Sequence, residues 1–79
     1  MKFRVWVRNA LRCRTFKKRK NAIAYIYREI RDHYKGNYDV HPVTIDRTHF
    51  FDVIEYSAPD MTPLKRHTFA EYTEYPDVV

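Results

Sequence analysis

Apolar and polar residues alternate over the first seven positions of the chain. Phe3, Val5 and Val7 stand between charged residues and a tryptophan. This is the period-two pattern of a strand with one face on a core and the other in water. The chain can turn at residues 8–10, and a shorter alternation over residues 11–14 predicts a second strand. The two strands would form a hairpin, although the turn lacks the Asn-Gly pair of the strongest hairpin signals.

The period changes to that of a helix between Thr15 and Tyr34. Thr15 is a suitable N-cap, because its hydroxyl can accept a hydrogen bond from a free amide of the first turn. Gly36 is the single glycine, and we expect it just past the helix in the left-handed conformation. The apolar side chains recur at helical spacing on one stripe, which consists of Phe16, Ile23, Ile26, Tyr27, Ile30 and Tyr34.

The rest of the chain has the patterns of further strands. Residues 38–46 include Pro42, which lacks a backbone amide and is therefore expected on an edge strand. Residues 49–57 are apolar on both faces and are expected inside the sheet, after a turn at Arg47 and Thr48. Residues 64–75 are a candidate for a last strand.

The order strand, strand, helix, strand, strand, with residues 64–75 as a candidate further strand, predicts an α+β fold. We expect a small antiparallel sheet of three to five strands with one amphipathic helix packed on one face. A chain of 79 residues has room for one domain, predicted over residues 1–75, and residues 76–79 are expected to fray. We expect Trp6, Phe51 and Val53 on the second face of the sheet or at its edge, and this face is either partly wrapped by the C-terminal segment or used for contact.

Charge is divided unevenly along the chain. Residues 1–35 hold twelve Lys or Arg against two acids, a net charge of +10, whereas residues 36–79 hold three against eight, a net charge of −5. A concentrated field of one sign attracts an oppositely charged partner over roughly 8–10 Å at moderate salt. The basic half therefore predicts an anionic partner. The alternative is that the two halves neutralise each other within the folded domain.

The cations of the predicted helix recur at intervals of three or four, interrupted by Ala24, and so would form one basic ridge beside the apolar stripe. At about 1.5 Å per residue the ridge would run for roughly 30 Å, long enough to follow several phosphates. Arg12 and Arg14 on the preceding strand would extend it. The members of the ridge are Lys17, Lys20, Arg28, Arg31 and Lys35.

Lys17, Lys18, Arg19 and Lys20 fall in the first turns of the predicted helix. Positive charge there opposes the helix macrodipole at a cost of about 0.3–1 kcal/mol per exposed group. Cations placed beside free helix amides create a site for an anion. The alternative is an ordinary solvated helix face. The candidate residues for binding nucleic acid or another anion are therefore Arg12, Arg14, Lys17, Lys18, Arg19, Lys20, Arg28, Arg31 and Lys35.

Aromatic side chains near the basic half could add stacking contacts. Trp6, Tyr25 and Phe51 could stack on bases or guanidinium groups if they are exposed, as aromatic residues do in single-strand binders. The alternative is that they are partly buried as core or cross-strand partners. The sequence contains no RNP-type aromatic motif, GXXG loop or zinc-finger spacing.

Residues that carry catalysis or hold a cofactor are sparse. Cys13 is the single cysteine, which rules out an internal disulfide and a multi-thiolate metal site. The four histidines show no short, regular ligand spacing, so we expect no bound metal. A single glycine leaves little scope for an oxyanion loop or a phosphate-cradling loop. We therefore expect no enzymatic activity and no cofactor.

The opening residues contain no apolar stretch long enough for a signal peptide or a membrane span, because Lys or Arg recurs every two to four positions. We expect no membrane interaction. A lone cysteine suits a reducing compartment, which predicts the cytoplasm.

The sequence leaves three hypotheses open. The first is a nucleic-acid-binding protein of low sequence specificity, for DNA or RNA. The second is a small regulatory or inhibitory protein that binds an acidic patch on a larger host protein, with aromatic anchors. Under the second hypothesis, the short length of the chain suggests that a phage encodes the protein, which would then act in the host cytoplasm. The third is a purely structural subunit. The oligomeric state is not predicted.

Overall fold

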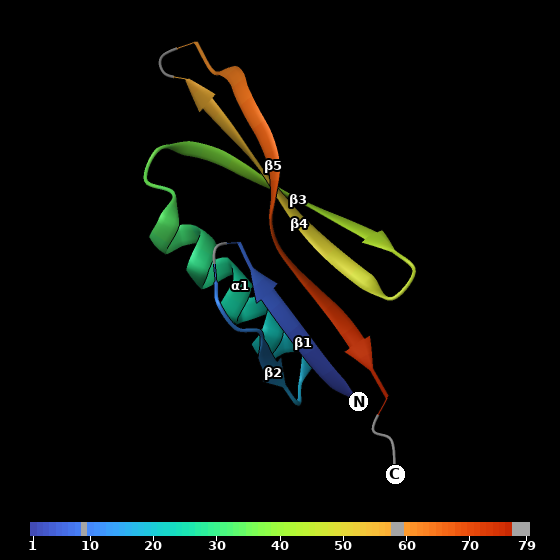
Figure 1. The fold of residues 1–79 in the computed structure, drawn as a ribbon. Helices are drawn as coiled ribbons and strands as arrows, with labels where there is room; N and C mark the ends of the chain where they lie inside the picture. Colours follow the sequence, from blue (N-terminus) through green and yellow to red (C-terminus); the bar gives the residue numbers. More distant parts are fainter. Residues whose placement is uncertain (9, 58–59, 77–79) are drawn as a thin grey trace.

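The segments with period-two alternation form one antiparallel sheet in the computed structural model, and the segment with helical spacing packs against it (Figure 1). The α+β class and the element order are as predicted, and the candidate last strand completes a sheet of five. The structure describes residues 1–8, 10–57 and 60–76. In chain order the elements are β1 (Lys2–Val7), β2 (Arg14–Phe16), α1 (Arg19–His33), β3 (Asn37–Ile45), β4 (Thr48–Ser57) and β5 (Thr62–Tyr75).

The strands lie in the order β2-β1-β5-β4-β3. The last strand, β5, is therefore central. It pairs with β1 from the basic half of the chain and with β4 from the acidic half. β4 has a neighbour on each side and β3 lies at an edge, as predicted. An edge strand such as β3 tolerates Pro42, because it pairs with a neighbour on one side only.

The core lies between α1 and the nearer face of the sheet. Ala22, Ile26 and Ile30 are the fully buried side chains of the helix, and they pack with strand residues such as Val5 and Val53. The molecule is elongated, 53 × 23 × 21 Å, and the β4–β5 end at the top of Figure 1 projects beyond the helix. No helix in the described part of the chain is both long and apolar enough to cross a membrane.

The helix begins three residues later than predicted. Thr15 is not its N-cap, because it lies in β2 opposite Arg4. Lys18 takes the N-cap position through its backbone, with no side-chain hydrogen bond. Gly36 is not left-handed either. Tyr34 leaves the helix with φ −102° and ψ 126°, so the chain passes directly into an extended conformation.

The second strand also lies later than the predicted residues 11–14. Leu11 is 99 % exposed, whereas Phe16 lies opposite Phe3 and packs on the core. The strand forms where an apolar side chain can reach the core, and residues 11–13 become part of the connection. The predicted turn at residues 8–10 includes Asn9, which lies outside the described residues. The β3–β4 turn comes one residue earlier than predicted, with Asp46 left-handed at φ 55°.

The predicted open sheet face is correct for Trp6 and wrong for Phe51 and Val53. Phe51 is 4 % exposed and Val53 is fully buried, both on the face that α1 covers. Trp6, at 45 % exposed, is on the opposite face. There it lies across from Glu71, which in turn lies across from Phe50. The alternation of β4 therefore places Phe50, not Phe51, on the open face.

The predicted frayed end falls mostly on residues 77–79, which lie outside the described residues. Pro76 is exposed and follows the end of β5. The sheet and its helix form one small domain.

Candidate functional site

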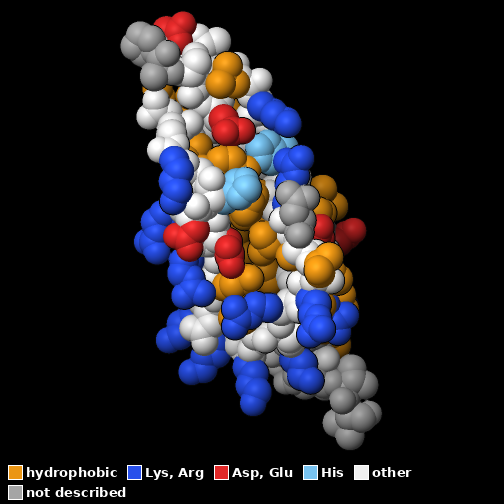
Figure 2. All heavy atoms as spheres, turned by 60° about the vertical axis from the view of Figure 1, so that its left-hand side comes forward, with side chains coloured by type: hydrophobic (Ala, Val, Ile, Leu, Met, Phe, Trp, Pro, Cys, Tyr) orange, Lys and Arg blue, Asp and Glu red, His pale blue; other side chains and the backbone are white. Residues whose placement is uncertain are grey.

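The cations of the N-terminal half gather on the part of the molecule built from β1, β2 and α1. Figure 2, which brings the left-hand side of Figure 1 forward, shows Lys and Arg side chains crowded over the lower part of that face and fewer toward the β4–β5 end. The charge segregation of the sequence is therefore kept in space. We call the side chains of Arg14, Lys18, Lys20, Arg28 and Arg31 the basic surface.

The N-terminus of α1 carries only cations. Lys18 is the N-cap, Arg19 and Lys20 follow it, and the first turn contains no acidic residue. The amides at this end have no side-chain cap, so free N–H groups and positive side chains are placed together. Both features attract an anion.

Replacing one of these cations with an acid should stabilise the fold. Lys20→Glu places a negative charge in the first turn, where the macrodipole favours it, and is expected to raise the free energy of unfolding by about 0.3–1 kcal/mol at low salt. Urea unfolding followed by circular dichroism measures the change. Lys35→Glu, just past the other end of α1, changes the net charge equally and should destabilise. A gain in stability from both variants would refute an effect of the helix dipole.

Arg19 differs from its neighbours because it has partners. Its guanidinium lies 5.6 Å from the centre of the Phe3 ring and pairs with the Glu74 carboxylate on β5. The same carboxylate lies 3.3 Å from His49 Nε2. Arg19 therefore attaches the start of the helix to the sheet. For Lys18, Lys20, Arg28 and Arg31, no ion pair occurs among the described residues.

The acidic C-terminal segment, as far as Pro76, does not lie over the basic surface. Glu71 and Glu74 belong to β5 in the middle of the sheet, where Glu71 faces Trp6 and Phe50. Glu74 reaches only Arg19 among the described cations of α1. The described part of the acidic half therefore leaves the solvent side of α1 uncovered.

The predicted ridge is shorter than the sequence suggests. Lys17 precedes α1 and Lys35 follows it, so neither continues the helical line. Lys20, Arg28 and Arg31 remain on it, over about 16 Å at 1.5 Å per residue. Arg12 lies in the connection before β2, and Arg14 lies on β2 itself. Arg14 reaches α1, because its guanidinium carbon lies 4.7 Å from the centre of the Tyr25 ring.

An open hollow of about 650 Å³ lies against α1. The exposed Ala24, where the basic line is interrupted, is part of its lining, together with cations and rings from β2, α1 and the start of β3. Sequence reasoning missed Tyr27 and Tyr38 as members of this site, because Tyr27 was assigned to the buried stripe. The lining residues are Arg14, Phe16, Asn21, Ala24, Tyr25, Tyr27, Arg28, Arg31 and Tyr38.

The three aromatic residues singled out from the sequence do not come together. Trp6 is on the open sheet face, away from α1. Phe51 is buried and cannot stack on a ligand without opening the core. Tyr25 follows the second of the two alternatives, because it is partly buried with its ring 5.4 Å from that of Phe16. Of the three, Tyr25 alone lines the hollow.

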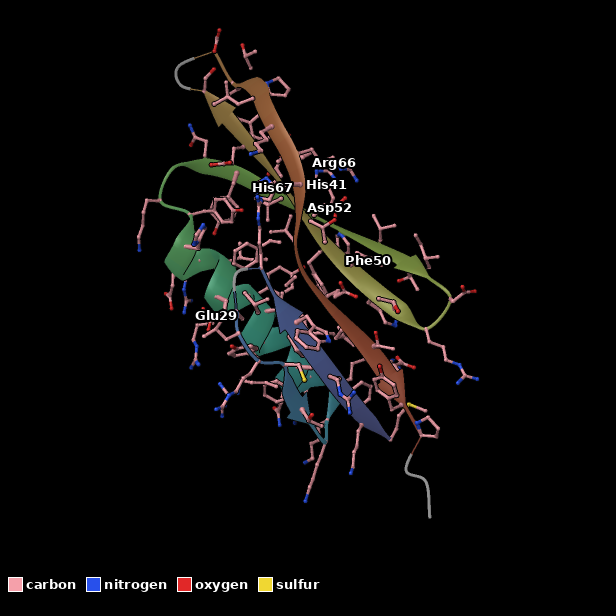
Figure 3. All side chains as sticks on the ribbon, viewed as in Figure 1. Glu29, His41, Phe50, Asp52, Arg66 and His67 are labelled. Atoms are coloured by element: carbon pink, nitrogen blue, oxygen red, sulfur yellow. The ribbon has the colours of Figure 1, made fainter. Side chains whose placement is uncertain are left out.

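A second hollow, of about 450 Å³, lies where the end of α1 meets β4 and β5. Tyr34 and His67 meet there through a hydrogen bond between the Tyr34 hydroxyl and His67 Nε2, and Figure 3 shows His67 in the middle of the molecule. His67 Nδ1 is buried and has no partner among the described residues. Burial raises the pKa of the Tyr34 hydroxyl, and the Glu55 carboxylate adds to the rise.

The pKa of His67 lies below its ordinary value, first because burial disfavours the charged ring and then because Arg8 and Lys65 repel it, against the opposing pull of Glu55 and Asp52. Between the lowered pKa and about 6.5 the unfolded chain binds more protons at this residue than the folded one. The stability contributed by neutral His67 is therefore present above about pH 6.5 and lost as the pH falls through the folded-state pKa.

Urea unfolding at about pH 7.5 and about pH 5 tests this dependence. The free energy of unfolding should be lower at the acidic pH, and the difference should shrink in His67→Gln, which can still accept the Tyr34 hydrogen bond. An unchanged difference in the variant would show that His67 does not control it.

The open face of the sheet holds a polar network around Asp52. Arg66 Nε donates to Asp52 Oδ2 over 3.1 Å, and the Thr68 hydroxyl donates to Asp52 Oδ1 over 2.7 Å. His41 on β3 is directly across from Asp52, and Figure 3 labels His41, Asp52 and Arg66 in the same region of the sheet. Asp52 is thus already paired. Within the described ranges, no three His, Cys, Asp or Glu side chains are placed to hold a metal ion.

No protein-family model, curated protein or solved structure matches this chain.

Proposed function

We propose that this protein is a small non-catalytic binding protein that engages nucleic acid through the basic surface of α1 and β2. The observation that carries the proposal is the N-terminus of α1, where cations follow one another with no acidic residue and no side-chain cap. Cations at this end of the helix oppose the helix dipole and favour binding of an anion. Arg28 and Arg31 extend the positive charge along the helix without ion-pair partners in the described part of the chain.

Cations of this kind bind phosphates and carry little sequence information. Each neutralised phosphate releases condensed counterions, and contacts to the backbone position a protein without reading bases. The proposal therefore includes low sequence specificity for DNA or RNA. We place the protein in the cytoplasm, where its single cysteine stays reduced.

Fluorescence anisotropy with a labelled oligonucleotide across a salt series tests the proposal. Log affinity should fall linearly with log salt, with a slope of roughly −0.7 to −0.9 for each phosphate contacted. Absence of binding at the lowest salt would remove nucleic acid as the partner.

A second candidate function is favoured by the open sheet face. Trp6, Phe50 and Val43 follow one another across β1, β4 and β3, interrupted at β5 by Glu71. Trp6 and Val43 are exposed and Phe50 is partly buried, and apolar side chains at a surface suit a protein partner. The protein would then regulate or inhibit a larger host protein, docking the basic surface on an acidic patch. A pull-down from nuclease-treated lysate distinguishes the two functions, because only a protein partner survives the treatment.

A further inference from the structure

The hollow on α1 combines two kinds of side chain that a nucleotide needs. Arg14, Arg28 and Arg31 supply positive charge, and Tyr25, Tyr27 and Tyr38 supply rings. Its described lining contains no acidic side chain. A volume of about 650 Å³ falls within the usual range of small-ligand sites, roughly 300–1,000 Å³.

Tyr27 is the ring best placed to receive a base. It is 41 % exposed, although Ile26 and Ile30 on the same helix are buried. Its contact with Phe51 is edge-to-face, with ring centres 5.7 Å apart and planes at 83°. An edge-to-face contact uses at most one face of each ring, so it leaves at least one face of Tyr27 free of Phe51. An exposed ring face is the feature on which unpaired bases stack.

The arginines flank this ring on the helix surface. Arg31 is four positions after Tyr27 and lies on the same face of the helix, and Arg28 lines the same hollow. Across the hollow, Arg14 covers the Tyr25 ring at 4.7 Å. Arg14 is exposed, so its guanidinium can also bind a phosphate.

We propose that the hollow binds an unpaired nucleotide of a single-stranded nucleic acid, with the base stacked on Tyr27 and the neighbouring phosphates held by Arg28 and Arg31. This inference rests on the proposed function and specifies its ligand. A duplex keeps its bases stacked inside and offers the hollow only phosphates. An acidic peptide would satisfy the arginines but leave the open ring face of Tyr27 without a base.

Binding of four probes tests the proposal: an oligothymidylate, a duplex of equal length, an abasic strand with the same backbone, and polyglutamate. The single strand should bind more tightly than the other three at equal salt. Tyr27→Leu, which keeps an apolar contact with Phe51, should weaken single-strand binding by about 5-fold or more and leave abasic binding unchanged. Tyr27→Phe keeps the ring and should bind as the wild type does. Circular dichroism confirms that each variant is folded.

A readout on the wild-type protein makes the test independent of the variants. A fluorescent adenine analogue placed in the strand should lose emission on binding, because stacking on tyrosine quenches it. Equal affinity for the single strand, the duplex and the abasic strand, with unchanged emission, would overturn the stacking inference while the proposed function stands. Polyglutamate that competes as well as the single strand would also overturn it. Failure of every nucleic acid to bind would overturn the proposed function itself.

Discussion

Reversing the two arginines beside Tyr27 is expected to weaken nucleic-acid binding by about 10- to 100-fold at low salt. The double variant Arg28→Glu, Arg31→Glu removes two phosphate contacts and puts negative charge in their place. The slope of log affinity against log salt should become less steep by about 2, because each phosphate contact contributes about one unit. Anisotropy titrations across a salt series give both the affinity and the slope.

The matched control changes the net charge by the same amount elsewhere. Arg47→Glu with Lys65→Glu alters two exposed cations of the acidic half, at the β3–β4 turn and on β5. This variant should bind within about 3-fold of the wild type, since a local site depends on nearby charges more than on distant ones. Equal losses in the two double variants would mean that net charge alone drives binding, against a site on α1.

The largest loss of stability is expected from Ile26→Ala. Ile26 is 0 % exposed and is one of the helix residues that join α1 to the sheet. Removing its side chain leaves a cavity, so the free energy of unfolding should fall by about 2–5 kcal/mol. A chain of this length has a total stability of roughly 4–12 kcal/mol, so the variant should be close to unfolding. Urea unfolding followed by circular dichroism measures the loss.

Leu11→Ala is the comparison for Ile26→Ala, because it also removes an aliphatic side chain. Leu11 is almost fully exposed in the connection before β2, and its loss should change the free energy of unfolding by less than about 0.5 kcal/mol. A loss from Ile26→Ala as small as that from Leu11→Ala would contradict the packing of α1 on the sheet.

The sequence predicts most of the fold because burial on one side leaves a clear period. Phe3, Val5 and Val7 alternate with polar residues and form β1, and Ile26 and Ile30 repeat at helical spacing and are buried. Pro42 correctly identifies an edge strand. In each case a single local rule and the tertiary structure agree.

The segment between β1 and α1 could not be placed from sequence. β2 has three residues, which is too short for alternation to reveal it, and its position depends on Phe16 reaching the core beside Phe3 and Tyr25. Thr15 carries an N-cap signal but is used in the strand. The N-cap is instead Lys18, which makes no side-chain capping hydrogen bond. Because lysine is not a typical N-cap residue, the sequence does not indicate this position.

The sequence predicts the charge of the candidate site but, apart from Tyr25, not its aromatic residues. The spacing of Arg28 and Arg31 follows from the helix, so a basic line could be predicted. β4 has aromatic residues on consecutive positions, and only the pairing of Phe51 with Ala70 decides that Phe51 faces inward and Phe50 outward. Tyr27 lies at the margin of the apolar stripe, where the tilt of the helix on the sheet decides its exposure.

Amide chemical shifts of the isotope-labelled protein, followed during titration with oligothymidylate at low salt, test the location of the binding surface most directly. The account predicts that the changes concentrate at Arg14, at residues 18–31 and at Tyr38, and that they disappear as salt is raised. Shifts confined to the open sheet face around Trp6 and Phe50, or no shifts at all, would contradict it.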